Sequence, residues 1–137
     1  MLIRQEKKSS EYRDAGIQKK EEIDMNMAEN IIMIIVLAWT ALIMIVVGVI
    51  QLKSKEPVGF YTGEKPLKRE QVADVELWNK KHGMMWIFYG VGMILAYLIG
   101  WLIGDEKISF VIFMSEIFGA IPVMIFYHHW LKKKYVK

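Results

Sequence analysis

Hydrophobic and polar residues are segregated along this chain instead of alternating at the period of an amphipathic helix or strand. Three stretches of 22 to 24 residues, at 30–52, 83–104 and 108–131, are almost entirely apolar. About 20 residues of α-helix are enough to cross the hydrocarbon core of a bilayer. The pattern predicts an all-α membrane protein with three transmembrane helices and excludes a water-soluble domain with a single core.

The polar segments between these spans predict how the helices are connected. Only residues 105–107 separate the second and third spans, so we expect a tight antiparallel hairpin there. Residues 53–82 form a longer hydrophilic loop, and its first half is rich in proline and glycine. Its second half, residues 67–82, lacks both and has apolar residues at helical spacing. This half predicts a juxtamembrane amphipathic helix, either separate or continuous with the second span.

The N-terminal segment is polar and carries mixed charges. We expect residues 1–29 to be a disordered or weakly helical tail, followed by a three-span membrane domain over 30–137. The start of the native protein is left open among Met1, Met25 and Met27, because the last two stand directly before the first span. No cleavable signal peptide is predicted, since the first apolar run is about twice the length of a signal-peptide core.

Charge and composition narrow the function classes. The chain has 18 Lys/Arg, 15 Asp/Glu and a formal net charge of +3, and the basic residues flank the spans, which favours lipid headgroups over nucleic acid. The loop and C-terminal tail carry 11 Lys/Arg and the other side 7. This bias predicts a multi-pass plasma-membrane protein with the loop 53–82 and the C-terminus inside and the N-terminus outside. Cysteine is absent, and no catalytic, phosphate-binding or dinucleotide motif occurs, so we expect no enzyme activity and no cofactor.

Glu116 is the only formally charged side chain within the three apolar stretches. It lies near the bilayer midplane, where an ionised carboxylate is costly and usually faces the interior of the bundle. Taking Glu106 as the pivot of the hairpin places Glu116 level with Ala96 and beside Tyr97, and Thr40 lies at similar depth. Two interpretations stay open: a carboxyl that binds a proton or cation, or a hydrogen-bonded carboxyl that joins helices.

Three histidines, His82, His128 and His129, are predicted to lie near one membrane edge. They are either a metal or pH-sensing site or simply interfacial side chains. Because neighbouring helical residues point about 100° apart, His128 and His129 cannot easily chelate one ion, and we predict no metal site.

Small residues recur at every fourth position of the second span, which lets another helix approach closely. The partner is either the third span or a second copy of the chain. The predicted packing residues are Gly92, Ala96, Gly100 and Gly104, with Gly119 on the third span.

The loop carries one distinctive pair of strings: residues 57–62 (PVGFYT), then residues 78–83 (WNKKHG) at the entry to the second span. This pattern resembles the SdpI-like family of small bacterial membrane proteins, and the overlap covers about 30–45 residues. The chain departs from the family in having Tyr61 in place of arginine, a longer spacer before Trp78 and fewer spans. The positions that carry over are Gly59, Thr62, Trp78 and His82.

The resemblance implies a plasma-membrane protein that confers immunity to a peptide toxin, sometimes coupled to signalling through a sequestered repressor. The leading hypothesis is therefore a non-enzymatic toxin-immunity or membrane-signalling protein. The alternatives are a small proton- or cation-coupled transporter or channel subunit that uses Glu116, and an accessory subunit of a larger membrane complex. Three spans bury little polar surface, so besides the bilayer we expect a homo-oligomer or a partner membrane protein.

Overall fold

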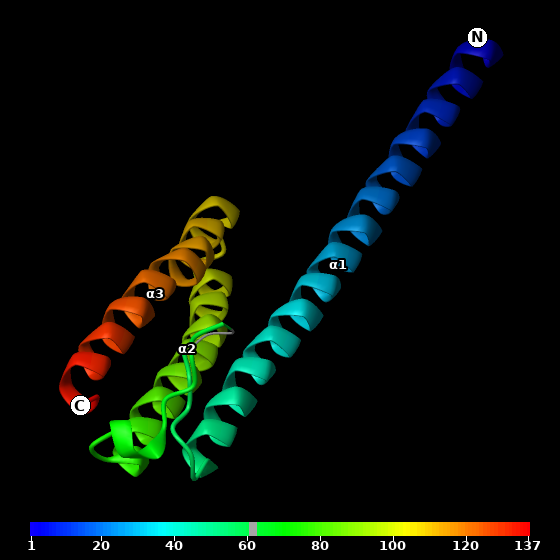
Figure 1. Ribbon diagram of the computed structural model, residues 1–137. Helices are drawn as coiled ribbons and strands as arrows, with labels where there is room; N and C mark the ends of the chain where they lie inside the picture. The colour runs from blue at the N-terminus through cyan, green and yellow to red at the C-terminus, as the bar shows by residue number, and fades with distance from the viewer. Residues whose placement is uncertain (61–62) are drawn as a thin grey trace. The chain divides into compact units, whose positions relative to one another are not determined.

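The chain is helical over most of its length. The computed structural model describes residues 1–60 and 63–137, in the order α1 (Leu2–Lys53), the 3-10 turn η1 (Arg69–Gln71), α2 (Val75–Ile103) and α3 (Glu106–Tyr135) (Figure 1). Among these residues, three helices are long and apolar enough to cross a membrane. The prediction of an all-helical protein with three helices long and apolar enough to span a membrane is confirmed, and these helices fit a small multi-pass integral membrane protein.

The chain divides into two compact units, residues 1–36 and residues 37–137. The first unit is the N-terminal part of α1 and is exposed throughout. Here the structure differs from the sequence prediction, because residues 2–29 are helical where a disordered or weakly helical tail was expected. The segment contains no proline and many Glu, Lys, Met and Gln residues, which have high helix propensity.

Within the second unit, small residues bring the last turns of α1 against α2. A Cβ atom on Gly83 would lie 2.6 Å from the carbonyl oxygen of Gly48, and one on Gly90 would lie 2.8 Å from the carbonyl oxygen of Ala41. Ala41 is fully buried. Such close approach of two backbones gives the van der Waals packing that holds helices together in lipid.

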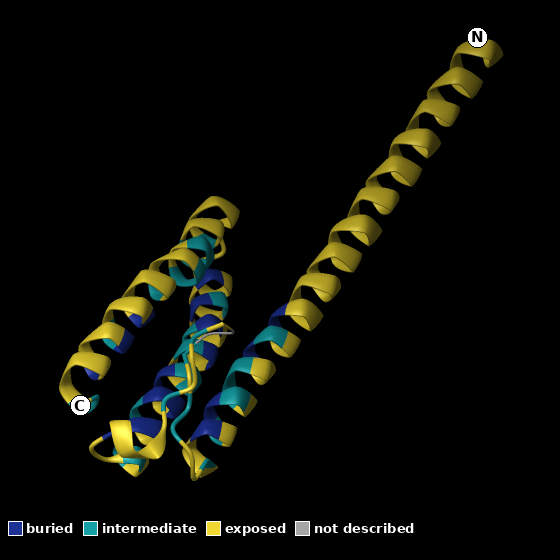
Figure 2. Ribbon diagram, in the orientation of Figure 1, coloured by how far each residue is buried: buried dark blue, intermediate teal, exposed yellow. Residues whose placement is uncertain are grey.

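α2 and α3 also pack against each other, with two residues between them. Gly104 adopts a left-handed conformation (φ 70°) at the end of α2, and the Asp105 side chain caps α3 by accepting from the Ile108 N–H at 3.0 Å. The Ser109 hydroxyl donates to the Gly100 carbonyl at 2.8 Å. Buried positions of α3 lie on the side that faces α2, and most of its remaining surface is exposed (Figure 2).

The small residues that were predicted to pack along α2 differ in what they contact. Gly92 packs against Glu116, Gly100 packs against Ser109, and Ala96 is buried. Gly104 ends the helix instead of packing against one, and a Cβ on Gly119 would meet no atom within 4 Å. The register therefore places Glu116 level with Gly92, one turn from the predicted Ala96, because the chain reverses at residues 104–105 and not at Glu106.

The segment predicted as a surface helix, residues 67–82, is not a separate helix. Its first part holds only η1, and residues 75–82 are the first two turns of α2. α2 begins where it does because the Asp74 side chain accepts from the Leu77 N–H at 2.9 Å, which is N-cap geometry.

The polar loop and the C-terminus fold together at the ends of α2 and α3. We call this unit, residues 54–60, 63–74 and 135–137, the loop cap. Val72 and Val136 form an isolated antiparallel bridge, and the Lys137 N–H donates to the Gln71 carbonyl at 2.9 Å. Val72 packs into a hydrophobic cluster with Trp78 and Leu131, both completely buried. This cluster ties the loop cap to the two helices.

Candidate functional site

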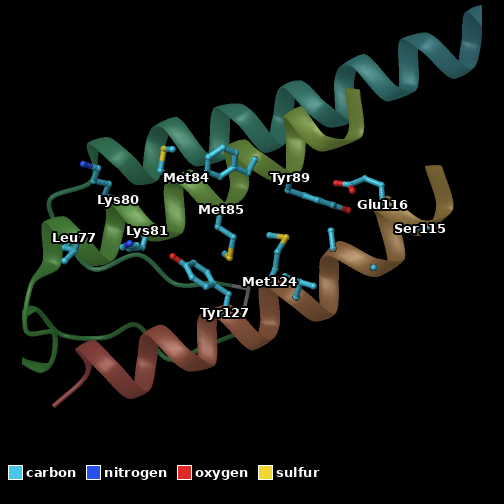
Figure 3. A pocket seen from close by; sticks show the side chains of 14 residues that line it. Leu77, Lys80, Lys81, Met84, Met85, Tyr89, Ser115, Glu116, Met124 and Tyr127 are labelled. Carbon is cyan, nitrogen blue, oxygen red and sulfur yellow. The ribbon is translucent and has the colours of Figure 1, made fainter. Parts of the chain in front are cut away.

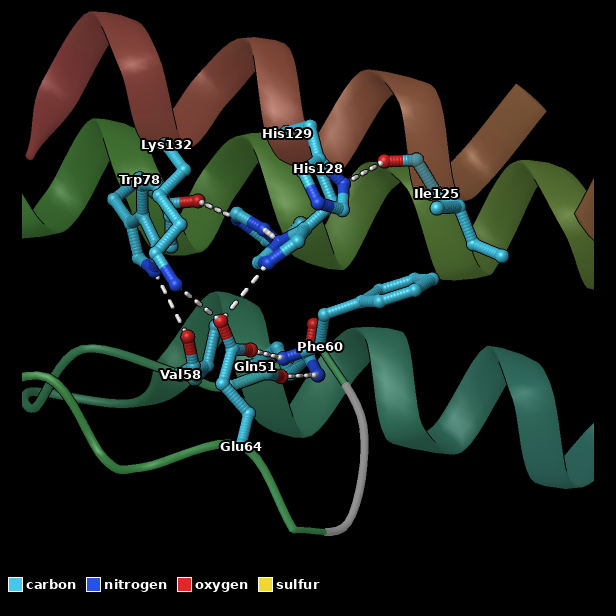
Figure 4. Close-up of polar contacts among 11 residues, drawn as sticks. Gln51, Val58, Phe60, Glu64, Trp78, Ile125, His128, His129 and Lys132 are labelled. Atoms are coloured by element: carbon cyan, nitrogen blue, oxygen red, sulfur yellow. Dashed lines mark hydrogen bonds and ion pairs between the residues drawn. The ribbon is translucent and has the colours of Figure 1, made fainter. Parts of the chain in front are cut away.

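A series of hydrogen bonds links α2, α3 and the loop cap through two buried histidines. His82 Nδ1 lies 2.9 Å from the Trp78 carbonyl oxygen, and His82 Nε2 lies 2.9 Å from His128 Nδ1. His128 Nε2 then lies 3.1 Å from Glu64 Oε1 (Figure 4). The two histidines are 0% and 2% exposed. We call Glu64, His128 and His82 the histidine–glutamate network.

Glu64 brings the loop cap into this network. Its side chain is only 8% exposed; Oε1 accepts from Lys132 Nζ at 3.0 Å, and Oε2 accepts from the Phe60 N–H at 3.2 Å. Burial by itself raises the pKa of this carboxyl. The hydrogen bonds from Lys132 and Phe60, with the charge of His128, outweigh burial and lower the pKa below its ordinary value of 4.5. The site therefore favours the carboxylate.

The first turn of α2 holds the first half of the loop. Asn79, 1% exposed, accepts from the Val58 N–H at 3.0 Å and donates to the carbonyls of Ser54 and Glu56, each at 2.9 Å. The Trp78 indole N–H donates to the Val58 carbonyl at 2.9 Å. Two adjacent side chains thus satisfy the backbone of a segment that has no regular structure of its own.

Aromatic rings enclose the network. The Phe60 ring stacks on His128 with centroids 4.9 Å apart, and the Trp78 ring lies 4.2 Å from His82. Hydrogen bonds in such a water-poor setting are stronger than in solvent, and an unpaired polar atom there is correspondingly costly. The network is therefore stable only when each of its protons has an acceptor.

The structure brings together part of the predicted loop motif. Trp78 and His82 belong to the site, and the Gly59 carbonyl accepts from Gln51 Nε2 at 3.4 Å. Thr62, the fourth motif position, lies outside the described residues. Glu64, Asn79 and Lys132 were missed, because in sequence they are ordinary polar residues of a loop, a helix entry and a basic tail.

The predicted histidine cluster separates into two kinds. His82 and His128 were expected at one membrane edge, and they contact each other directly. His129 is exposed and bonds the Ile125 carbonyl of its own helix at 2.9 Å. Among the described residues, no group of three or more His, Cys, Asp or Glu is arranged to hold a metal ion.

Glu116 lies away from this network, on the wall of a cavity between α2 and α3. It packs against Gly92, and Figure 3 shows the Tyr89 side chain pointing toward it. Neither Tyr97 nor Thr40, its predicted partners, is among the described residues that line this cavity. The shifted register explains why Tyr89 points toward Glu116 where Tyr97 was predicted. Glu116 is level with Gly92, and Tyr89 and Gly92 are within one turn of each other.

No family model, curated protein or solved structure matches the chain. The function is therefore inferred from the chemistry of the network and of the cavity.

Proposed function

We propose that this protein is a small, non-enzymatic membrane protein of the toxin-immunity or membrane-signalling type, and that the loop cap recognises its partner. The observation that carries this proposal is the fixed docking of a polar, irregular loop by buried side chains, chiefly Asn79, Trp78 and Glu64. A surface whose conformational entropy is already lost before binding costs less to bind than a free loop. Such a loop suits recognition.

The resemblance to the SdpI-like family supports the same assignment. Of its four carried-over positions, Gly59 and Trp78 make hydrogen bonds that dock the loop, and His82 contacts His128, which in turn contacts Glu64 of the loop. We place the loop cap and the basic C-terminus on the inner side of the plasma membrane, with a tight antiparallel hairpin on the outer side. The partner is then an inner membrane-surface protein, or the membrane-proximal part of another membrane protein.

The histidine–glutamate network makes docking dependent on a proton. A carbonyl oxygen only accepts, so His82 Nδ1 carries the hydrogen that faces Trp78. Each of the three contacts in the series needs one proton, and two neutral imidazoles supply two. The third proton lies between His128 Nε2 and Glu64 Oε1. Either His128 carries it, as an imidazolium facing a carboxylate, or Glu64 carries it, as a carboxylic acid facing an imidazole. Lys132, which also bonds Glu64, favours the first arrangement; His129 faces away.

Acid is expected to undock the loop cap. The pKa of Glu64 is below 4.5 in the docked state, so the contribution of its carboxylate is present above about pH 4.5 and is lost as the pH falls through the lowered pKa. The contribution of the third proton is lost in the opposite direction, when the pH rises and that proton leaves His128 Nε2 and Glu64 Oε1. The native chain has no cysteine, so spin labels on Glu56→Cys and Lys133→Cys report the docking distance by pulsed electron resonance. We expect one narrow distance at pH 6 and a broad distribution at pH 3. Glu64→Gln keeps a hydrogen-bonding group that does not titrate, so only the two histidines of the network still take up protons in acid, and the acid transition should become smaller. An unchanged acid transition in this variant would contradict the role of Glu64.

The immunity or signalling function is expected to depend on the loop cap and not on Glu116. We expect deletion of the gene in the native bacterium to reduce growth in the presence of membrane-active peptide toxins. Reintroduction of the intact gene should restore growth. Trp78→Ala and His82→Ala should abolish this protection, and Glu116→Gln should retain it.

If Glu116→Gln alone abolishes protection, and also abolishes proton flux in reconstituted vesicles, the transporter hypothesis replaces the immunity or signalling hypothesis. Its supporting observation is the placement of Glu116 on a cavity wall.

A further inference from the structure

A second site lies between α2 and α3, on the wall that holds Glu116. It is a cavity of about 820 Å³, within the size range of small-molecule sites. Its walls are mainly apolar and include Met84, Met85, Phe88 and Met124. Methionine and phenylalanine side chains suit a flexible hydrocarbon, because they adapt to irregular shapes without requiring hydrogen bonds.

The two ends of this cavity differ in chemistry. Lys80 and Lys81 line one end, and Figure 3 shows Lys81 and Tyr127 there on opposite walls. Ser115 and Glu116 line the other end. Neither lysine has an ion-pair partner among the described residues, whereas Lys132 is paired with Glu64. The lysine end therefore offers two cations and the tyrosine hydroxyl to an anionic group.

The length of the cavity matches one leaflet of a bilayer. Lys81 precedes Gly92, the residue level with Glu116, by 11 positions, or about 16 Å along α2. One leaflet of hydrocarbon is about 15 Å thick. The two lysines lie just before the apolar stretch that begins at Gly83, which is headgroup depth, and Glu116 lies near the midplane. A lipid with its phosphate at the lysines would end its acyl chain at Tyr89 and Glu116.

We propose that this cavity binds one anionic phospholipid from the leaflet on the loop side, with its phosphate on Lys80 and Lys81 and one acyl chain between α2 and α3. Apolar walls account for the chain, and the unpaired cations account for preference for an anionic headgroup. This site is independent of the function proposed for the loop cap.

The test is native mass spectrometry of the delipidated full chain titrated with phosphatidylglycerol, phosphatidylcholine or glycerol phosphate. We expect one phosphatidylglycerol to bind more tightly than phosphatidylcholine, and glycerol phosphate not to bind, because it lacks the chain. The double variant Lys80→Gln/Lys81→Gln should reduce the preference for phosphatidylglycerol over phosphatidylcholine by about fivefold per lysine. Lys133→Gln/Lys134→Gln, an equal loss of charge outside the cavity, should leave it unchanged.

A second variant tests the acyl-chain site. A Cβ on Gly119 would meet no atom within 4 Å and Gly119 lines the cavity, so Gly119→Phe fills the space that the chain occupies. It should weaken both phospholipids; if it fails to fold by circular dichroism, Val123→Trp on the same wall replaces it. The proposal is overturned if the Lys133/Lys134 pair lowers the preference as much as the Lys80/Lys81 pair. It is also overturned if the filled cavity binds phospholipid as before, or if glycerol phosphate binds as well as the lipid.

Discussion

Replacing His128 with alanine is expected to release the loop cap from the ends of the helices. The change removes the group that joins His82 to Glu64 and leaves His82 Nε2 buried without a partner. Leaving such a group unpaired, together with loss of the Glu64 contact, costs about 3 kcal/mol. That cost raises the undocked fraction about 100-fold.

Hydrogen exchange measures this release directly. The Val58 N–H donates to the buried side chain of Asn79 on α2, so this amide is protected while the loop cap is docked. In the His128→Ala variant the exchange of the Val58 amide should speed up by about 100-fold, because local opening costs less free energy. The matched control is His129→Ala, the adjacent exposed histidine, which bonds only within α3. Equal exchange rates in the two variants would show that the network does not hold the loop.

Replacing Gly83 with alanine is expected to destabilise the packing of α1 on α2. The new methyl group would lie 2.6 Å from the Gly48 carbonyl oxygen and 2.8 Å from Leu52 Cγ. The first of these is a backbone atom, so the helices must separate to admit the methyl group. Overpacking of this kind costs about 1–3 kcal/mol. The shift would also disturb the loop cap, because His82 and Trp78 lie in the same turns of α2.

Gly119→Ala provides the matched control for this change. Both variants make the same chemical replacement inside a helix, and both gain about 1 kcal/mol of helix propensity. Only Gly83 has atoms where the methyl group would go; Gly119 has none within 4 Å. The free energy of unfolding, measured by detergent titration with circular dichroism, should fall for Gly83→Ala and should hold or rise for Gly119→Ala. A decrease of the same size in both would remove the steric explanation.

The site itself was only partly predictable. Trp78 and His82 stood out because they belong to the loop motif that resembles the SdpI-like family, and the depth of His128 followed from the short connection between the second and third spans. Glu64 did not stand out, since it is one of many loop charges and lies 64 positions from His128. Asn79 was hidden for the same reason: its three partners are backbone groups more than 20 residues away. Partners of this kind carry no periodic signal.

The sequence by itself determined the number of spans and the polar nature of the ends, because hydrocarbon tolerates about 20 apolar residues in a helix and almost no charge. Only the tertiary structure decided which polar residues meet. Because the chain reverses at Gly104 and Asp105, Glu116 lies level with Gly92 and not with Ala96. Folding of the loop onto α2 and α3 brings Glu64 into contact with His128. The composition of a span is set by the lipid hydrocarbon around it, and each residue is favourable or unfavourable there independently of its neighbours. Side-chain partners reflect the register between helices, which is set by packing contacts distant in sequence.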